Sequence, residues 1–244
     1  MKPARSLRLE VAEVHVWRIS LALGESVVHR FREFLSPDEI RLADRFRLEK
    51  DRRCFTIARG ALRQILCLYL KIKPESVLFS YAGNGKPELV DCINQLNLRF
   101  NLSHSKNLAL VAIAQGFRVG IDVEFVDRQR ATEEIADRFF SACEVKTLRA
   151  LDYAQRLEAF FDYWTRKEAY LKAFGRELLT SLSSFEVECS PEIQAAPSRV
   201  DNRLDEVAGW SMYEVAVGNR YRAAVAVEGS DRVLRCWQWI APPG

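Results

Sequence analysis

The chain has 244 residues, of which 48% are hydrophobic, and 36 lysines and arginines stand against 33 aspartates and glutamates. This length and apolar content suffice for one large domain or two compact halves, which excludes disorder as the main state. The net charge of only +3 argues against bulk nucleic-acid binding, so we expect no nucleic-acid partner.

The six cysteines are widely spread, with no CxxC pair and no histidine at the spacing of a metal site. We therefore expect reduced thiols in a cytoplasmic protein. The basic start of the chain lacks the uninterrupted apolar core of a signal peptide, and no later run approaches the ~20 residues that span a bilayer. Secretion and membrane association are not expected.

In the first half of the chain, period-two alternation predicts a strand over Glu13–Ile19. A helix should begin at Ser36, where an N-cap serine, a proline at the first helical position and a glutamate three residues later follow one another. A longer amphipathic helix is predicted over Lys50–Leu70. Two strands follow over Leu98–Leu102 and Leu108–Ala114, and the second is so apolar that we expect it at the centre of its sheet.

The second half opens with a strand over residues 119–125, in which apolar residues alternate with Gly120, Asp122 and Glu124. Gly175 is expected to end the strongest helix of this half, and Gly218 to open a hairpin turn. The other expected elements, in chain order, are helices over Glu133–Phe140, Ser141–Leu151 and Ala154–Phe174, a polar loop over residues 193–202, strands over Trp210–Val217 and Tyr221–Val227, and a terminal strand within residues 233–244.

A weak internal repeat links the two halves, because the sequence around Ser36 recurs around Ser141 and a long amphipathic helix follows each. The alignment pairs Phe55, Arg59, Leu62 and Arg63 with Trp164, Glu168, Leu171 and Lys172. It predicts an α/β (α+β) fold of two similar halves, residues 1–117 and 118–244. The halves would be related by a pseudo-twofold, with the active site in the cleft between them.

Three acids stand out as candidate metal ligands. Asp122 and Glu124 share one face of their strand, and Glu168 and Lys172 are neighbours at i, i+4 on a helix. Taken separately, these are typical of a solvated strand face and of a helical ion pair worth about 0.3 to 0.5 kcal/mol. Two acids side by side between apolar runs repel each other unless a cation or a base neutralises them, which favours a site for Mg2+.

Basic and polar residues elsewhere could bind phosphate. Candidates are Lys86, Lys172 and the pair Ser103 and His104, which lies in a polar break between two predicted strands. A basic run extends from Arg41 through Arg45, Arg47, Lys50 and Arg52 to Arg53, and most of its members are expected to form a solvated face.

Three motifs then occur in the order of a known family. They are Phe100-Asn101-Leu102-Ser103-His104-Ser105, Gly120-Ile121-Asp122-Val123-Glu124, and Trp164-x-x-Lys167-Glu168-Ala169-x-x-Lys172, supported by Gly85-Lys86-Pro87 and Phe139-Phe140-Ser141. Over about Val14 to Phe185 the chain resembles the Sfp-type 4′-phosphopantetheinyl transferases. Each motif alone is weak, but the set is highly specific.

The resemblance implies a monomeric enzyme that binds coenzyme A in the cleft, with Mg2+ on its pyrophosphate. By motif, Asp122, Glu124 and Glu168 match the metal-binding acids; Lys86, Ser103 and His104 match residues that bind coenzyme A; and Lys172 matches the lysine at the reacting phosphate. An arginine that grips the 3′-phosphate is assigned to Arg53 rather than the adjacent Arg52. Glu168, Lys172 and His104 are then the candidate catalytic residues.

The implied reaction is transfer of 4′-phosphopantetheine from coenzyme A to a serine of an apo acyl or peptidyl carrier protein, with release of 3′,5′-ADP. Glu168 is the candidate general base. The acidic carrier is expected to dock on the Leu78–Asn84 loop and the edge of Arg41–Arg53. Two alternatives remain open: a non-catalytic module that binds carrier proteins, and, less favoured because its acid and lysine are four apart on a helix, a Mg2+-dependent nuclease.

Overall fold

The computed structural model describes residues 7–81, 85–175, 182–187, 197–200 and 209–241. The chain forms two compact units, the first made of Met1–Gly116 with Leu234–Gly244 and the second of Phe117–Val233. Each unit combines helices with a β-sheet, so the expected mixed α/β class is confirmed. Among the described residues, none of the helices combines the length and apolar character that a bilayer span requires.

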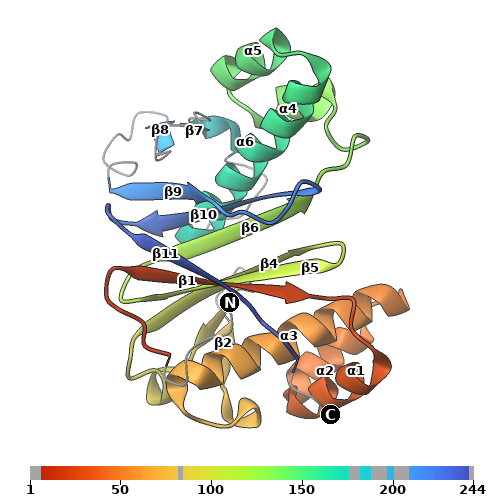
Figure 1. Ribbon diagram of the computed structural model, residues 1–244, viewed down its shortest axis with the longest axis vertical. Helices are drawn as coiled ribbons and strands as arrows, with labels where there is room; N and C mark the ends of the chain where they lie inside the picture. The colour runs from red at the N-terminus through yellow and green to blue at the C-terminus, as the bar shows by residue number, and fades with distance from the viewer. Residues whose placement is uncertain (1–6, 82–84, 176–181, 188–196, 201–208, 242–244) are drawn as a thin grey trace. The chain divides into compact units, whose positions relative to one another are not determined.

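The sheet of unit 1 has the strand order β11-β1-β5-β4, as Figure 1 shows. Its strands are β1 (Glu13–Ser20), β4 (Leu98–Ser105), β5 (Leu108–Gln115) and β11 (Val233–Gln238). The apolar strand β5 pairs with both β1 and β4, which confirms its predicted central place. β4 runs three residues further than predicted, so Ser103 and His104 lie within a strand and not in a break between strands.

Helix α3 covers one face of this sheet and supplies most of the helical part of its core. The helices of unit 1 are α1 (Glu25–Phe34), α2 (Pro37–Asp44) and α3 (Glu49–Leu70). The capping box predicted at Ser36 is present, with the Ser36 hydroxyl accepting from the Glu39 amide. The α1 helix was not predicted, because Gly24 at its N-cap offers no side-chain hydrogen bond.

The sheet of unit 2 has the order β6-β10-β9, and α6 packs across it (Figure 1). Its strands and helices are β6 (Val119–Phe125), β9 (Trp210–Glu214), β10 (Tyr221–Glu228), α4 (Glu133–Phe139), α5 (Ala142–Ala150) and α6 (Tyr153–Phe174). Gly175 ends α6 in the left-handed conformation, as predicted. Gly218 likewise has a positive φ in the turn before β10.

Small elements join the main ones. They are the hairpins β2 (Phe79–Tyr81) with β3 (Pro87–Leu89) and β7 (Phe185–Val187) with β8 (Pro197–Val200), and the 3-10 turns η1 (Pro74–Ser76), η2 (Asp91–Ile93) and η3 (Leu182–Ser184). The predicted loop over residues 193–202 is wrong at 197–200, because these residues pair with β7 as a strand. Residues 193–196, 201 and 202 lie outside the described residues.

The end of the chain differs from the predicted domain division. The structure separates the units between Gly116 and Phe117, next to the predicted boundary, but residues 234–244 belong to unit 1 and not to the second half. The reason is that β11 adds to the edge of the sheet at β1. Trp237 then packs on His15 and Trp17, and Arg235 pairs with Glu13 at 3.0 Å.

The two units repeat one order of elements, in a register other than the one predicted. In each unit a strand precedes three helices, a 3-10 turn and a short hairpin. Helices α3 and α6 both have 22 residues, so their fifteenth residues, Arg63 and Lys167, correspond. The sequence alignment instead pairs Arg63 with Lys172, because periodic helices align almost equally well when shifted by about one turn.

Candidate active site

The acids of β6 face helix α6, and Gly120 is the residue that allows the helix to approach. A Cβ atom at Gly120 would overlap the backbone of Ala169 and Ala173 in α6. Because side chains alternate along a strand, Asp122 and Glu124 point the same way as Gly120. Asp122 is 2% exposed, whereas Glu124, nearer the end of the strand, is only partly buried.

Lys172 bridges α6 and β6. Its Nζ donates to Asp122 Oδ1 at 2.6 Å. Burial acts to lower the pKa of Lys172, but Asp122, Glu168 and Glu124 outweigh burial and raise it, so the ammonium stays charged. Lys172 therefore forms an ion pair with the strand, and its charge also interacts with Glu168, one turn away on the same helix.

Glu168 is held in an environment that opposes its ionisation. The residue is only 4% exposed. Burial raises the pKa of Glu168 to about 7, the nearby Asp122 and Glu124 charges add to the rise, and Lys172 and Arg130 act against it. A carboxyl that titrates near neutrality can accept a proton at physiological pH, which is the property a general base needs.

Glu124 is paired with Arg130, a residue that no motif in the sequence assigns to the site. The Arg130 guanidinium donates to Glu124 at 2.9 Å from the loop after β6. In the sequence, Arg130 is distinguished only by its position six residues after Glu124. Arginines are common in loops, so this spacing does not predict an ion pair. Lys172 and Arg130 thus both place a cation next to the acid cluster.

The donor set suits a hard cation better than zinc. Asp122, Glu124 and Glu168 offer carboxylate oxygens only, the ligands that Mg2+ takes. Within the described residues, no group of three or more His, Cys, Asp or Glu side chains is already arranged to hold a metal ion. Mg2+ usually binds through one or two carboxylates together with substrate phosphates, so the chemistry of these residues fits the ion without a preformed protein cage.

Of the residues predicted to bind coenzyme A, Lys172 lies in unit 2, and the other four, Lys86, Ser103, His104 and Arg53, lie in unit 1. Ser103 is buried in β4 while the next residue, His104, is exposed, because they point to opposite faces of the strand. Lys86 is partly buried, and burial lowers its pKa in spite of the opposing charge of Glu88.

Arg53 projects from the first turns of α3 and is already engaged. It pairs with Glu25 of α1 and donates to the Leu23 carbonyl at 3.0 Å. Arg52 pairs instead with Glu49 on its own helix. The two adjacent arginines therefore point in different directions, and binding of a phosphate by Arg53 would require it to leave or share Glu25.

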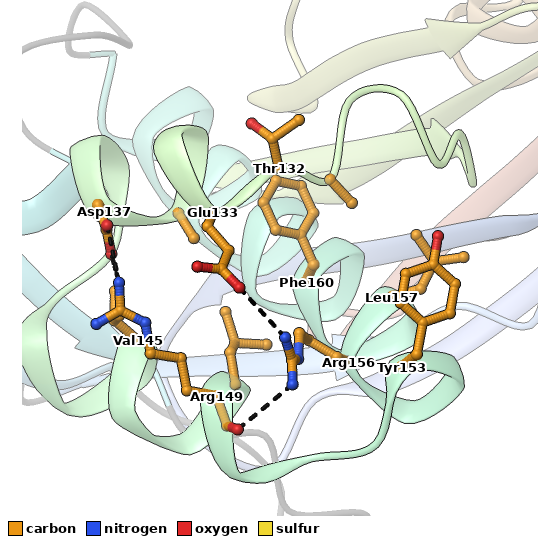
Figure 2. Close-up of a pocket in the computed structure, with 12 residues that line it drawn as sticks. Thr132, Glu133, Asp137, Val145, Arg149, Tyr153, Arg156, Leu157 and Phe160 are labelled. Carbon is orange, nitrogen blue, oxygen red and sulfur yellow. Dashed lines mark hydrogen bonds and ion pairs between the residues drawn. The ribbon is translucent and has the colours of Figure 1, made fainter.

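A pocket in unit 2 is separate from the acid cluster. Figure 2 shows it between α4, α5 and the start of α6, with Glu133 facing Arg156 and Asp137 facing Arg149 across its rim. These ion pairs measure 3.4 Å and 2.9 Å. Within the part of the chain that the structure describes, none of the predicted site residues lines this pocket.

Comparison with known proteins places the chain in a family. A family model described as 4′-phosphopantetheinyl transferase superfamily matches residues 118–226, and one described as 4′-phosphopantetheinyl transferase, N-terminal, matches residues 25–116. The chain is 40% identical to the 4′-phosphopantetheinyl transferase HetI of Nostoc sp. over 96% of its own length and 95% of that protein. It is 29% identical to 4′-phosphopantetheinyl transferase Sfp of Bacillus subtilis over 86% and 89% of the two chains.

A solved holo-(acyl-carrier-protein) synthase from Bacillus anthracis, in complex with CoA (3′,5′-ADP), covers 46% of this chain and 96% of its own, at 19% identity and a TM-score of 0.37. The sequence matches extend over both units and nearly the whole of the Nostoc protein. This chain belongs to the 4′-phosphopantetheinyl transferase superfamily.

Proposed function

We propose that the buried acid cluster of unit 2 carries out transfer of 4′-phosphopantetheine from coenzyme A to a serine of an apo carrier protein, with Mg2+ bound at the cluster. The chain is a transferase of this family, and the proposal concerns which residues do the work. The observation that carries it is the contact of β6 with α6, where Glu168 lies beside Asp122 and Lys172.

The residues of the cluster share the tasks of the reaction, and Glu168 has two of them. Glu168 accepts the proton of the carrier serine while the serine oxygen forms a bond to the β-phosphorus of coenzyme A, and the bond from that phosphorus to the oxygen of the 3′,5′-ADP group breaks. Lys172 stabilises the charge on the phosphate oxygens. Asp122, Glu124 and Glu168 would hold Mg2+, which neutralises pyrophosphate charge when bound.

Coenzyme A is assigned to Ser103, His104, Lys86 and Arg53 by resemblance to the family. These four assignments stay predictions, as do the catalytic role of His104, the monomeric state and the cytoplasmic location. For Arg53 the supporting fact is that its guanidinium lies at the surface of unit 1, near the first turns of a helix.

Incubation with an apo acyl or peptidyl carrier protein, coenzyme A and Mg2+ tests the proposal. The expected result is a mass gain of one phosphopantetheine on the carrier serine, and its loss in excess EDTA. Asp122→Ala should raise the Mg2+ concentration needed for half-maximal rate sharply, because one of the proposed ligands is gone. Transfer that persists in EDTA would overturn the metal assignment, and absence of transfer from the unaltered protein with every carrier class would overturn the function.

The carrier protein is assigned to a basic and apolar surface of unit 1. From the second half of α2 to the start of α3, exposed apolar residues alternate with exposed arginines; they are Leu42, Phe46 and Leu48, and Arg41, Arg45 and Arg47. Leu48 is 64% exposed, and neighbouring exposed apolar residues of this kind mark interaction sites when they form a continuous patch. An acidic helix with an apolar stripe is the partner that such a surface fits.

The second part of this predicted surface is the segment from Leu78. Leu78 and Tyr81 are exposed apolar residues, whereas residues 82–84 lie outside the described residues. Exposed aromatic and aliphatic side chains beside arginines are the composition found at the centre of protein interfaces.

Charge reversal on this surface should weaken carrier binding and leave the chemical step unchanged. Arg45→Glu with Arg47→Glu is expected to raise the KM for an acidic carrier about tenfold or more, with kcat within about twofold, since rim charges act mainly on encounter. Steady-state kinetics against carrier concentration measures both. Lys146→Glu, an exposed change on α5, is the matched control. An unchanged KM in the double variant would place the carrier elsewhere.

A further inference from the structure

Lys167 immediately precedes Glu168 in the third motif, yet its side chain points into the protein and not into the acid cluster. It is 0% exposed, and its Nζ pairs with Glu144 of α5 at 2.8 Å. The same Nζ donates to the carbonyl of Leu182 at 2.6 Å and to that of Phe185. One ammonium therefore connects α6 to α5, to the start of the η3 turn and to the first residue of β7.

Glu144 extends this network to two more backbone groups. Its side chain accepts from the Ser141 amide at 2.8 Å, closing the capping box of α5, and from the Val187 amide of β7 at 2.9 Å. Each oxygen of the buried carboxylate thus accepts from one backbone amide, and Oε2 also pairs with Lys167. Such a fully hydrogen-bonded buried pair has one favoured geometry, and removal of either partner leaves a buried charge.

Unit 1 contains the same arrangement. Arg63, 1% exposed and at the corresponding position of α3, binds Glu39 of the α2 capping box at 2.6 Å. Its guanidinium also donates to the carbonyls of Pro74 and Val77, each at 2.8 Å, at the start and just after the end of η1. A buried cation thus connects capping box, long helix and 3-10 turn in both units.

The two copies differ in the residues that come after the cation along the helix. Glu168 is the next residue after Lys167, and Lys172 lies four residues further on; in unit 1 the same positions are Gln64 and Leu68. The buried cation that connects capping box, long helix and 3-10 turn therefore occurs once beside the acid cluster and once without it. Its structural role in both units does not require that the cation contact substrate.

We propose that Lys167 is a positioning residue: its anchors on Glu144, Leu182 and Phe185 fix the rotation of α6, so that Glu168 and Lys172 face Asp122. This rests on the proposed roles of Glu168 and Lys172. On the sheet side, the absence of a side chain at Gly120 sets how closely α6 approaches β6.

A small rotation of α6 about its own axis is enough to misplace its catalytic side chains. Side-chain ends lie about 5 to 6 Å from a helix axis, so a roll of roughly 10° displaces the Glu168 carboxylate by roughly 1 Å. A misplacement of about 1 Å can cost about 100-fold in rate. Lys167 and Glu168 are consecutive residues of α6, so the contacts that fix the position of Lys167 also fix the backbone of Glu168.

The test compares Lys167→Met with Arg63→Met, a matched control that removes the same kind of anchor from the unit without the acids. Both variants are expected to lower the melting temperature. Corrected for the folded fraction, kcat at saturating coenzyme A and carrier should fall about 100-fold in Lys167→Met and stay within about twofold in Arg63→Met. Mg2+ affinity, titrated calorimetrically with saturating coenzyme A, should weaken about 10-fold or more only in Lys167→Met.

Two further variants keep the test decisive if Lys167→Met folds poorly. Glu144→Gln with Lys167→Met leaves no unpaired buried charge and should recover stability, but kcat should stay low because the carbonyl anchors are still missing. Lys167→Arg should restore most of kcat, since Arg63 makes the equivalent contacts in unit 1. Equal kcat and Mg2+ affinity per folded molecule in Lys167→Met and the unaltered protein would overturn the inference. Absence of transfer from the unaltered protein would instead overturn the proposed function.

Discussion

Glu168→Gln is expected to lower kcat by about 10²- to 10⁴-fold while the protein keeps its fold, because the amide matches the shape of the carboxyl but cannot accept the serine proton. The variant should also be more stable than the unaltered protein in EDTA at pH 8. The buried carboxylate beside Asp122 and Glu124 opposes folding when it is charged, and glutamine removes that charge. Activity and stability would then change in opposite directions, as at many catalytic sites.

Transfer kinetics and thermal unfolding of the same preparation test this result. Glu158→Gln is the matched control, because Glu158 lies on the same helix but is exposed and pairs with Arg222. It should leave kcat and the pH 8 melting temperature nearly unchanged. Turnover by Glu168→Gln at the rate of the unaltered enzyme would remove Glu168 from the roles of base and metal ligand.

The contribution of Glu168 to the stability of the metal-free protein is expected to fall as the pH rises from about 4.5 to about 7. Burial and the neighbouring acids raise the pKa of Glu168 from its ordinary 4.5 to about 7, so the folded state binds a proton more tightly than the unfolded state does. Below pH 4.5 both states are protonated and there is no penalty. Above pH 7 both are ionised, and the penalty reaches roughly 3 kcal/mol.

Mg2+ should reverse this trend, because a bound cation favours the ionised carboxylate. The melting temperature is expected to rise on addition of Mg2+ much more at pH 8 than at pH 5. Denaturant unfolding in EDTA and in excess Mg2+ across this pH range measures both effects.

Subtraction of the Glu168→Gln profile isolates the contribution of this one group. A difference profile that is flat between pH 4.5 and 8 in EDTA would contradict the environment assigned to Glu168. A difference profile that Mg2+ leaves unchanged would contradict its role as a ligand.

The elements with strong local signals could be predicted from the sequence. The amphipathic period of α3 and α6, the capping box at Ser36 and the terminal glycine Gly175 specify helices that hydrogen-bond locally, so their bounds agree with the structure to within about one residue. Helix α1 was missed because it has no capping side chain and is held by packing of Phe31 against Gly60 of α3. Its stability comes from a partner that its own sequence does not reveal.

The sequence by itself determined the family, the strand that presents Asp122 and Glu124 on one face, and the helix that carries Glu168. These follow from motifs and from periods of two and 3.6 residues, which depend only on near neighbours along the chain. Pairing across the chain required the tertiary structure. Lys172 donates to Asp122, 50 residues away in the chain and on a different element. Lys167, adjacent to Glu168, turns away to Glu144, because residues next to each other on a helix point about 100° apart.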